Sequence, residues 1–193
     1  MRGVQILKGV SIHTHNNQTA CCYWFTGLPG AGKSTIANQA ARNLRALGYR
    51  VSVLDGDELR TGLNRGVGFS KADRAENVRR IGEVAKLMVE AGLIVLVSAI
   101  APYRADREAA RSRINCQRYF EVFVDTHLQT CIARDTKGLY ARAKKGEIKG
   151  LTGWDDPYEV PEAPEIRIRT QQTTAEAAAL QIEKHYFWLN NGH

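Results

Sequence analysis

Residues 27–34 read GLPGAGKS and match the pattern G-x-x-x-x-G-K-[ST] at every fixed position. An apolar stretch, residues 21–25, leads directly into this loop, and a helical pattern follows it. A loop of this kind folds so that its backbone N–H groups point at one anion, and the N-terminus of the next helix adds partial positive charge. A chance glycine-rich turn is a poor explanation for four fixed positions in this context. We therefore expect a nucleoside triphosphate to bind here, with Lys33 on its phosphates and Ser34 near Mg²⁺.

Length and composition favour one α/β domain. The chain has 193 residues and 44% hydrophobic content, which is enough to bury a single core without disulfides or metals. A formal charge of +7 suits an anionic partner but does not choose among nucleotide, nucleic acid and acidic membrane. The four cysteines include no C-x-x-C pair, which predicts reduced structural thiols. They lie at positions 21, 22, 116 and 131. The sequence has no long apolar run, so we expect a cytoplasmic protein without a membrane span.

Strand and helix patterns alternate along residues 19–193, which we interpret as one domain. The expected strands are 21–25, 50–54, 93–97, 120–125 and 166–169, and the expected helices are 34–47, 72–91, 127–134 and 174–188. This alternation predicts a three-layer α/β fold with a mostly parallel central sheet. Residues 1–18 are expected to be irregular. His13 and His15 in that segment are candidates for a metal pair, although solvated terminal sequence is the more common situation.

Residues 136–164 break the alternation. They contain a basic, helix-like piece at 141–145, followed by a stretch rich in glycine and proline. A segment of this length inside a compact domain is usually a functional lid or disordered. We favour a lid.

Two carboxylates, Asp55 and Asp57, follow the strand at 50–54. This is the edge at which open α/β sheets hold their ligands. Residues two apart in an extended chain point the same way, so both side chains can face the phosphates. One of them can instead cap the helix that starts near Glu58. We assign capping mainly to Asp55, and catalysis together with metal binding to Asp57.

Basic residues cluster shortly afterwards, and Arg74 lies one helical turn from Asn77 on the same face. Arginine suits planar, bidentate recognition of phosphate-like anions. A second anionic substrate would explain the cluster. A solvated helix face paired with nearby glutamates is a credible explanation for Arg79 and Arg80, and a weaker one for the whole cluster. The clustered arginines are Arg60, Arg65, Arg74, Arg79 and Arg80.

Several blocks together resemble the adenylylsulfate kinase family. They are the loop at 27–35, LDGDELR at 54–60, GLN at 62–64, GFS at 68–70, DRAENVRRIGEVAK at 73–86, PYR at 102–104, FVD at 123–125, ARD at 133–135, KGLY at 137–140 and GEIKG at 146–150. The loop alone is widely shared among nucleotide-binding proteins. The combination of D-G-D, G-F-S, the R-x-E-N-x-R-R-I-G-E helix and K-G-L-Y is far more restrictive, and the blocks span about residues 20–170.

The resemblance implies a P-loop kinase fold and transfer of the ATP γ-phosphoryl group to the 3′-hydroxyl of adenylyl sulfate. It implies Mg²⁺ as cofactor, held by Ser34 and Asp57, and Asp57 as base with Lys33 as the second catalytic residue. It also implies a homodimer and an ATP sulfurylase as a fused or separate partner, without nucleic acid or membrane. The implied ATP-binding residues are Gly27, Gly30, Ala31, Gly32, Lys33, Ser34, Thr35, Arg134 and Thr173. Those implied for adenylyl sulfate are Asp57, Arg60, Phe69, Arg74, Asn77, Ile100, Ala101, Lys137 and Leu151.

Two positions depart from the family pattern. Many members have serine before the Pro-Tyr-Arg block, where a phosphoserine has been considered, and this chain has Ala101. A phosphoserine at this position is therefore excluded, and direct in-line transfer does not need one. Leu151 stands where a phenylalanine usually stacks on the substrate adenine. We expect Phe69 to stack on one side only, which weakens acceptor binding without changing the reaction.

Three alternatives remain open. A nucleoside monophosphate or gluconate kinase would share the loop, but the block around Phe69 and the K-G-L-Y sequence argue against it. A GTP-dependent switch or a nucleic-acid-binding module would use the loop and the basic charge. However, the chain lacks an N-K-x-D guanine motif and interleaved exposed aromatics. A kinase-like regulatory domain of a bifunctional sulfurylase-kinase is the third alternative, although Lys33, Asp57 and Arg74 are all present.

Overall fold

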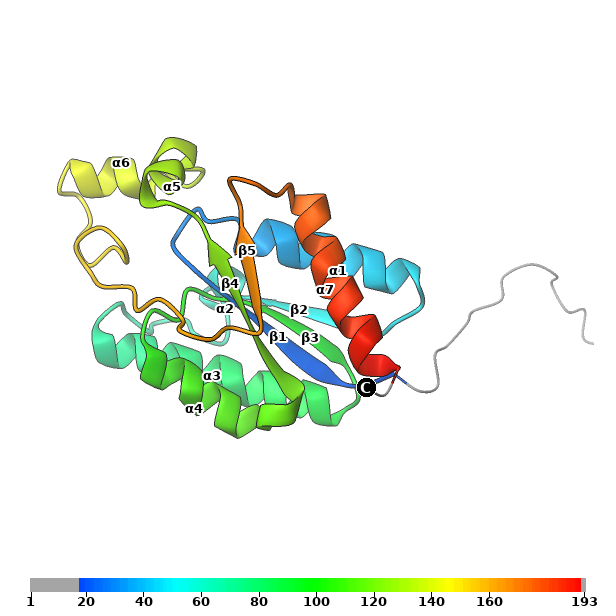
Figure 1. The fold of residues 1–193 in the computed structure, drawn as a ribbon. Coiled ribbons are helices and arrows are strands. Elements are labelled where there is room, and N and C mark those ends of the chain that lie inside the picture. Colours follow the sequence, from blue (N-terminus) through cyan, green and yellow to red (C-terminus); the bar gives the residue numbers. More distant parts are fainter. Residues whose placement is uncertain (1–17, 192–193) are drawn as a thin grey trace, which may run out of the picture.

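A computed structural model describes residues 18–191 of the chain (Figure 1). Five parallel strands form one sheet in the order β2-β3-β1-β4-β5. They are β1 (Cys21–Thr26), β2 (Val51–Asp55), β3 (Ile94–Ser98), β4 (Tyr119–Asp125) and β5 (Ile166–Arg169). The predicted strands are thus confirmed within about one residue at each end. The predictions for His13, His15 and the irregular segment 1–18 fall on residues outside this range, apart from Gln18.

Helices cover both faces of the sheet, as the three-layer prediction requires (Figure 1). On one face α1 (Lys33–Ala46) packs against α7 (Ala175–Asn190), and on the other α3 (Lys71–Glu90) packs against α4 (Arg104–Ile114). The short elements are α2 (Gly56–Leu59), the 3₁₀ turn η1 (Cys116–Arg118), α5 (Leu128–Arg134) and α6 (Leu139–Lys144). None of the helices in the described part of the chain is long and apolar enough to cross a membrane.

The central strand β1 explains why residues 21–25 are continuously apolar. Cys21, Tyr23 and Phe25 point into the core beneath α1 and α7. Cys22 and Trp24 point into the core beneath α3 and α4. All five are fully buried, so a strand in the middle of a parallel sheet shows no polar alternation. Cys131 is buried as well, whereas Cys116 is exposed, and all four cysteines are free thiols.

Helix α4 is the main element that the sequence prediction missed. Its sequence, RADREAARSRI, is mostly polar and buries only Arg107, Ala110 and Ile114. The apolar stripe is too narrow to show a clear helical period, and one of its three buried positions is an arginine. Tertiary packing against α3 therefore decides the structure here.

Candidate functional site

The loop at residues 27–34 follows β1 and ends at the N-terminus of α1. Gly32 caps this helix in the left-handed conformation, with φ of 105°. A Cβ atom on Gly27 would lie 2.7 Å from the carbonyl oxygen of Val124, so β4 passes too close for a side chain. The loop geometry thus depends on glycine at these positions.

Lys33, the first residue of α1, turns back onto this loop. Its Nζ donates to the carbonyl oxygens of Gly27 (2.9 Å) and Leu28 (2.8 Å). Burial lowers the pKa of Lys33 to about 8, opposed in part by the charge of Asp57. The ammonium group is therefore held inside the anion-binding loop, where a phosphate would replace the carbonyl contacts.

A cavity of about 940 Å³ opens above this loop. Its wall includes seventeen of the eighteen predicted site residues, and Gly27 is the exception. The lining residues that belong to the predicted ATP site, which we call the donor half, are Gly30, Ala31, Gly32, Lys33, Ser34, Thr35, Arg134 and Thr173. Those that belong to the predicted adenylyl sulfate site, which we call the acceptor half, are Asp57, Arg60, Phe69, Arg74, Asn77, Ile100, Ala101, Lys137 and Leu151. The structure thus brings residues from the whole length of the chain to one cavity.

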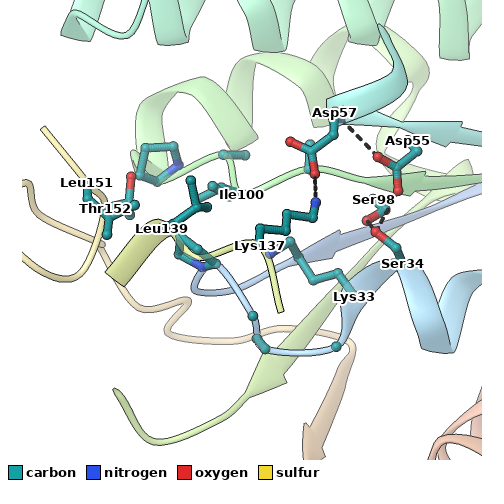
Figure 2. Close-up of a pocket in the computed structure, with 18 of the residues that line it drawn as sticks. Lys33, Ser34, Asp55, Asp57, Ser98, Ile100, Lys137, Leu139, Leu151 and Thr152 are labelled. Atoms are coloured by element: carbon teal, nitrogen blue, oxygen red, sulfur yellow. Dashed lines mark hydrogen bonds and ion pairs between the residues drawn. The ribbon is translucent and has the colours of Figure 1, made fainter. Parts of the chain in front are cut away.

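Asp55 lies at the end of β2 and carries two roles. Its Oδ1 accepts a hydrogen bond from the backbone N–H of Asp57 (2.9 Å), so the predicted capping role is confirmed, although the helix begins at Gly56 and not near Glu58. Its Oδ2 accepts from the Ser34 hydroxyl at 2.5 Å, and Ser98 lies 3.0 Å from the same hydroxyl (Figure 2). Asp55, which the sequence analysis assigned mainly to capping, is therefore the carboxylate beside Ser34.

This hydroxyl and carboxylate pair has the donor chemistry that Mg²⁺ prefers. Within residues 18–191 there is no group of three or more His, Cys, Asp or Glu side chains placed to hold a metal ion. Such a group is not required, because Mg²⁺ usually binds one or two carboxylates together with substrate phosphates. The residues present fit a magnesium–triphosphate complex.

Asp57 faces the cavity from α2 and is exposed. Lys137, from the segment before α6, reaches across the cavity and forms an ion pair with its Oδ2 (Figure 2). Both side chains are more than half exposed, so they remain accessible to a ligand. The contact places a carboxylate and a movable ammonium group at the same point, between the loop and the acceptor half of the cavity.

Phe69 is flanked by two guanidinium groups at the far end of the cavity. Arg60 lies 4.3 Å and Arg74 5.8 Å from its ring centroid, and the ring itself is 62% exposed. Ser70 then caps α3 in a reciprocal capping box with Asp73, which fixes where the helix begins. An exposed aromatic face between cations suits a stacked, negatively charged aromatic ligand.

Arg74 and Asn77 are buried on α3, as their shared face predicted. Arg74 donates from Nε to the carbonyl oxygen of Phe69 (3.0 Å) and from Nη2 to that of Gly150 (2.5 Å). Asn77 accepts from the Asn64 side chain at 3.0 Å. Arg74 thus connects α3 to the predicted lid.

The outer arginines on this helix behave differently. Arg79 and Arg80 are both paired with Glu76, at 2.7 Å in each case. These pairs lie on the outer surface of α3 and do not line the cavity. The solvated-face interpretation is therefore correct for these two residues.

Residues 136–164 contribute part of the cavity wall, including Lys137, Leu139 and residues 148–152. The basic piece predicted at 141–145 corresponds to α6, from which the Tyr140 hydroxyl donates to the carbonyl oxygen of Pro29 at 3.0 Å. Leu151 is buried at the cavity wall and Gly153 packs against Leu28. The segment therefore contacts the phosphate loop as well as Arg74.

Comparison with known proteins identifies the family of this chain. A family model described as adenylylsulphate kinase matches residues 19–169. The chain belongs to this family. It is 51% identical to an adenylyl-sulfate kinase of Lactiplantibacillus plantarum, over 90% of this chain and 86% of that protein. The adenylylsulphate kinase match thus includes every strand of the sheet and the whole segment 136–164.

Two further relatives extend the comparison. The solved APS kinase of Mycobacterium tuberculosis, in complex with AMPPNP and APS, superimposes with a TM-score of 0.83 at 45% identity, covering 86% of this chain and 97% of that one. The bifunctional enzyme NodQ of Azospirillum brasilense is 55% identical over 86% of this chain. This chain spans only 27% of the length of NodQ.

Some residues that shape the site have no sequence signal of their own. Ser98 ends β3 and contacts Ser34, but a serine at a strand end is common. Arg107 supports the cavity wall from behind, and its sequence neighbourhood looks like an exposed helix. The sequence at 106–107 could indicate a buried arginine only if the position of α4 in the fold were already known.

Proposed function

We propose that this chain transfers the γ-phosphoryl group of ATP to the 3′-hydroxyl of adenylyl sulfate, giving 3′-phosphoadenylyl sulfate. The observation that carries the proposal is the single cavity in which a phosphate loop faces an exposed aromatic ring set between two arginines. A nucleotide triphosphate suits the first half and a second anionic nucleotide suits the second. Asp57 and Lys137 lie where the halves meet.

The donor half holds ATP chiefly through the backbone. The loop N–H groups and the N-terminus of α1 surround the phosphates, and Lys33 neutralises charge on the group being transferred. Arg134 donates to the carbonyl oxygen of Ala31 at 3.3 Å, and Thr173 lies on the same wall, which suits contacts with the nucleoside part of ATP.

The acceptor half orients adenylyl sulfate through side chains. Phe69 stacks on the adenine, and Arg60, Arg74 and Asn77 face its sulfate and phosphate oxygens. Asp57 accepts the proton of the 3′-hydroxyl as this oxygen attacks the γ-phosphorus. Lys137 leaves Asp57 for the phosphate oxygens, so the carboxylate becomes available as a base. Ile100, Ala101 and Leu151 complete the apolar wall.

Mg²⁺ fits the pair formed by Ser34 and Asp55, with Asp57 nearby. When bound, the ion neutralises charge on the β- and γ-phosphate oxygens. We therefore revise the expected metal set from Ser34 with Asp57 to Ser34 with Asp55. This division leaves Asp57 to the acceptor hydroxyl.

Direct transfer is the simplest route, because Ala101 offers no hydroxyl for a phosphoenzyme. A single in-line displacement inverts the configuration at phosphorus, whereas two successive displacements retain it. ATP made chiral at the γ-thiophosphate should therefore give an inverted product with this chain. Retention would contradict direct transfer without affecting the acceptor assignment.

The acceptor is tested by measuring ADP release with adenylyl sulfate, AMP and gluconate supplied separately. Adenylyl sulfate should give the highest kcat/KM by at least about two orders of magnitude, because a site built for an anionic group loses affinity when that group is missing. Turnover with AMP or gluconate but not with adenylyl sulfate would overturn the proposal.

Assembly is a separate proposal. We infer a homodimer, and an ATP sulfurylase as a fused or separate partner in the manner of the bifunctional relatives. Light scattering of the purified chain, alone and with a sulfurylase, should show a mass of about twice 21.5 kDa for the chain alone. A monomer at all concentrations would contradict the dimer.

A further inference from the structure

Arg107 is a buried cation that the proposed reaction does not use. It projects from α4 with 2% of its surface exposed and does not line the cavity. Each of its three guanidinium nitrogens donates to a different oxygen. These are Glu121 Oε1 at 2.6 Å and the carbonyl oxygens of Ala101 and Glu159, both at 2.8 Å.

The first of these carbonyls belongs to the acceptor loop, which we define as residues 99–103 between β3 and α4. Ala101 adopts a left-handed conformation with φ of 43°, unusual for a residue other than glycine. Arg107 donates a hydrogen bond to the carbonyl oxygen of Ala101, and the Thr26 hydroxyl donates one to the carbonyl oxygen of Ile100 at 2.6 Å. Two successive carbonyls of the cavity wall are therefore fixed from behind by buried side chains.

The second carbonyl belongs to the return leg, which we define as residues 157–160, near the C-terminal end of the predicted lid and shortly before β5. Glu159 meets the acceptor loop at further points: its N–H donates to Pro102 at 2.9 Å, and its side chain accepts from the N–H of Arg104 at 2.6 Å. Tyr158 joins the same network through the Thr26 hydroxyl at 2.9 Å. The acceptor loop and the return leg therefore share their anchors.

Arginine suits this position for a geometric reason. Its planar guanidinium presents several donors in fixed directions, whereas lysine has a single ammonium on a flexible stem. The Glu121 carboxylate on β4 compensates the buried charge, which would otherwise be costly. A lysine could keep the pair with Glu121 but could not also hold both carbonyls in place.

We propose that Arg107 is a positioning residue for the acceptor: it fixes the spacing between the acceptor loop and the return leg, and so sets the shape of the adenylyl sulfate half of the cavity. The inference rests on the proposed function for the identity of the acceptor. We expect the effect to reach the acceptor wall through Ile100 and Ala101 more than the phosphate loop, because the three oxygens to which Arg107 donates all lie outside that loop.

The test compares Arg107→Lys with Arg111→Lys. Arg111 lies one turn further along α4 and pairs with Glu165 at 2.6 Å, but it contacts neither the acceptor loop nor the return leg. Arg107→Lys should raise the KM of the best acceptor about tenfold and leave the KM of ATP within twofold. Arg111→Lys should leave both within twofold. If Arg107→Lys only reduced the amount of active protein, kcat would fall and both KM values would stay unchanged. That result would overturn the proposal.

Amide hydrogen exchange gives a second readout that needs no acceptor. Arg107→Lys should speed exchange in residues 99–103 and 157–160 together, while exchange in the phosphate loop stays as in the parent chain. Unchanged exchange in both segments would contradict the positioning role. Failure of the parent chain to phosphorylate adenylyl sulfate would instead contradict the proposed function and leave the exchange result to decide the role of Arg107.

Discussion

The two halves of the cavity are built in different ways. The phosphate-binding part of the donor half is formed by the backbone of one continuous stretch, residues 27–34, between β1 and α1. The acceptor half is formed by side chains from α2, α3, the acceptor loop and the predicted lid. Arg74 and Gly150, which meet there, are 76 residues apart in the sequence.

This difference teaches where specificity can change within the fold. Backbone N–H groups read a phosphate in the same way whatever the nucleotide, so the donor half tolerates little variation. Side chains such as Phe69 and Arg74 read the particular acceptor, and each can be exchanged without altering the backbone. Variants in the two halves should therefore differ in the substrate whose binding or turnover changes.

The largest effect is expected at the junction of the halves. Asp57→Asn should lower kcat by about 10³-fold, because the amide cannot take the proton of the attacking hydroxyl. The dissociation constant of ADP should stay within about threefold. Glu58→Gln, at the next position and also exposed, is the matched control. Activity near that of the parent chain would remove Asp57 from the role of base.

Gly27→Ala probes the donor half. The new methyl group would lie 2.7 Å from the carbonyl oxygen of Val124, so the loop or β4 must shift. ADP affinity should weaken at least tenfold and the melting temperature should fall. Gly62→Ala, where no atom lies within 4 Å of the added carbon, is the control and should change neither. Unaltered ADP binding in Gly27→Ala would show that the loop geometry is not fixed by β4.

Arg74→Lys probes the acceptor half. The lysine retains the charge but loses the planar guanidinium group, which donates hydrogen bonds to the carbonyl oxygens of both Phe69 and Gly150. The KM of adenylyl sulfate should rise about tenfold with little change in the KM of ATP. Arg79→Lys, on the outer surface of the same helix, should behave like the parent chain. Equal losses for both substrates would mean that Arg74 serves stability and not recognition.

Leu151→Phe should have the smallest effect. It restores the aromatic face that the family resemblance implies opposite Phe69, and should lower the KM of adenylyl sulfate about threefold. Leu151→Met, which adds no ring, should leave this KM unchanged. Steady-state kinetics at saturating ATP measures both variants. A higher KM in the phenylalanine variant would show that the buried Leu151 position has no room for stacking.

The phosphate loop could be predicted from the sequence, because its geometry is encoded in adjacent residues. The loop pattern requires glycine where φ is positive, and the five strands appear as short apolar runs. The capping role of Asp55 could be predicted for the same reason: it acts on the N–H two residues away.

The residues predicted for the acceptor half do line one cavity, but their contacts could not be predicted from the sequence. The family resemblance supplied Arg74, Lys137 and Leu151, whereas the bond from Arg74 to Gly150 and the pair of Lys137 with Asp57 depend on how distant segments fold together. Asp55 beside Ser34 was missed because β2 and α1 meet only in the folded chain. Helix α4 was missed because its inward face carries Arg107 among small residues.

The most direct test of the account is the position of the transferred phosphoryl group. Nuclear magnetic resonance of the product formed from ATP and adenylyl sulfate should show a new phosphomonoester coupled to the ribose H3′. The amount of inorganic phosphate should be small, because the γ-phosphoryl group is directed to the acceptor and not to water. A phosphomonoester at another position, or inorganic phosphate as the main product, would contradict the account.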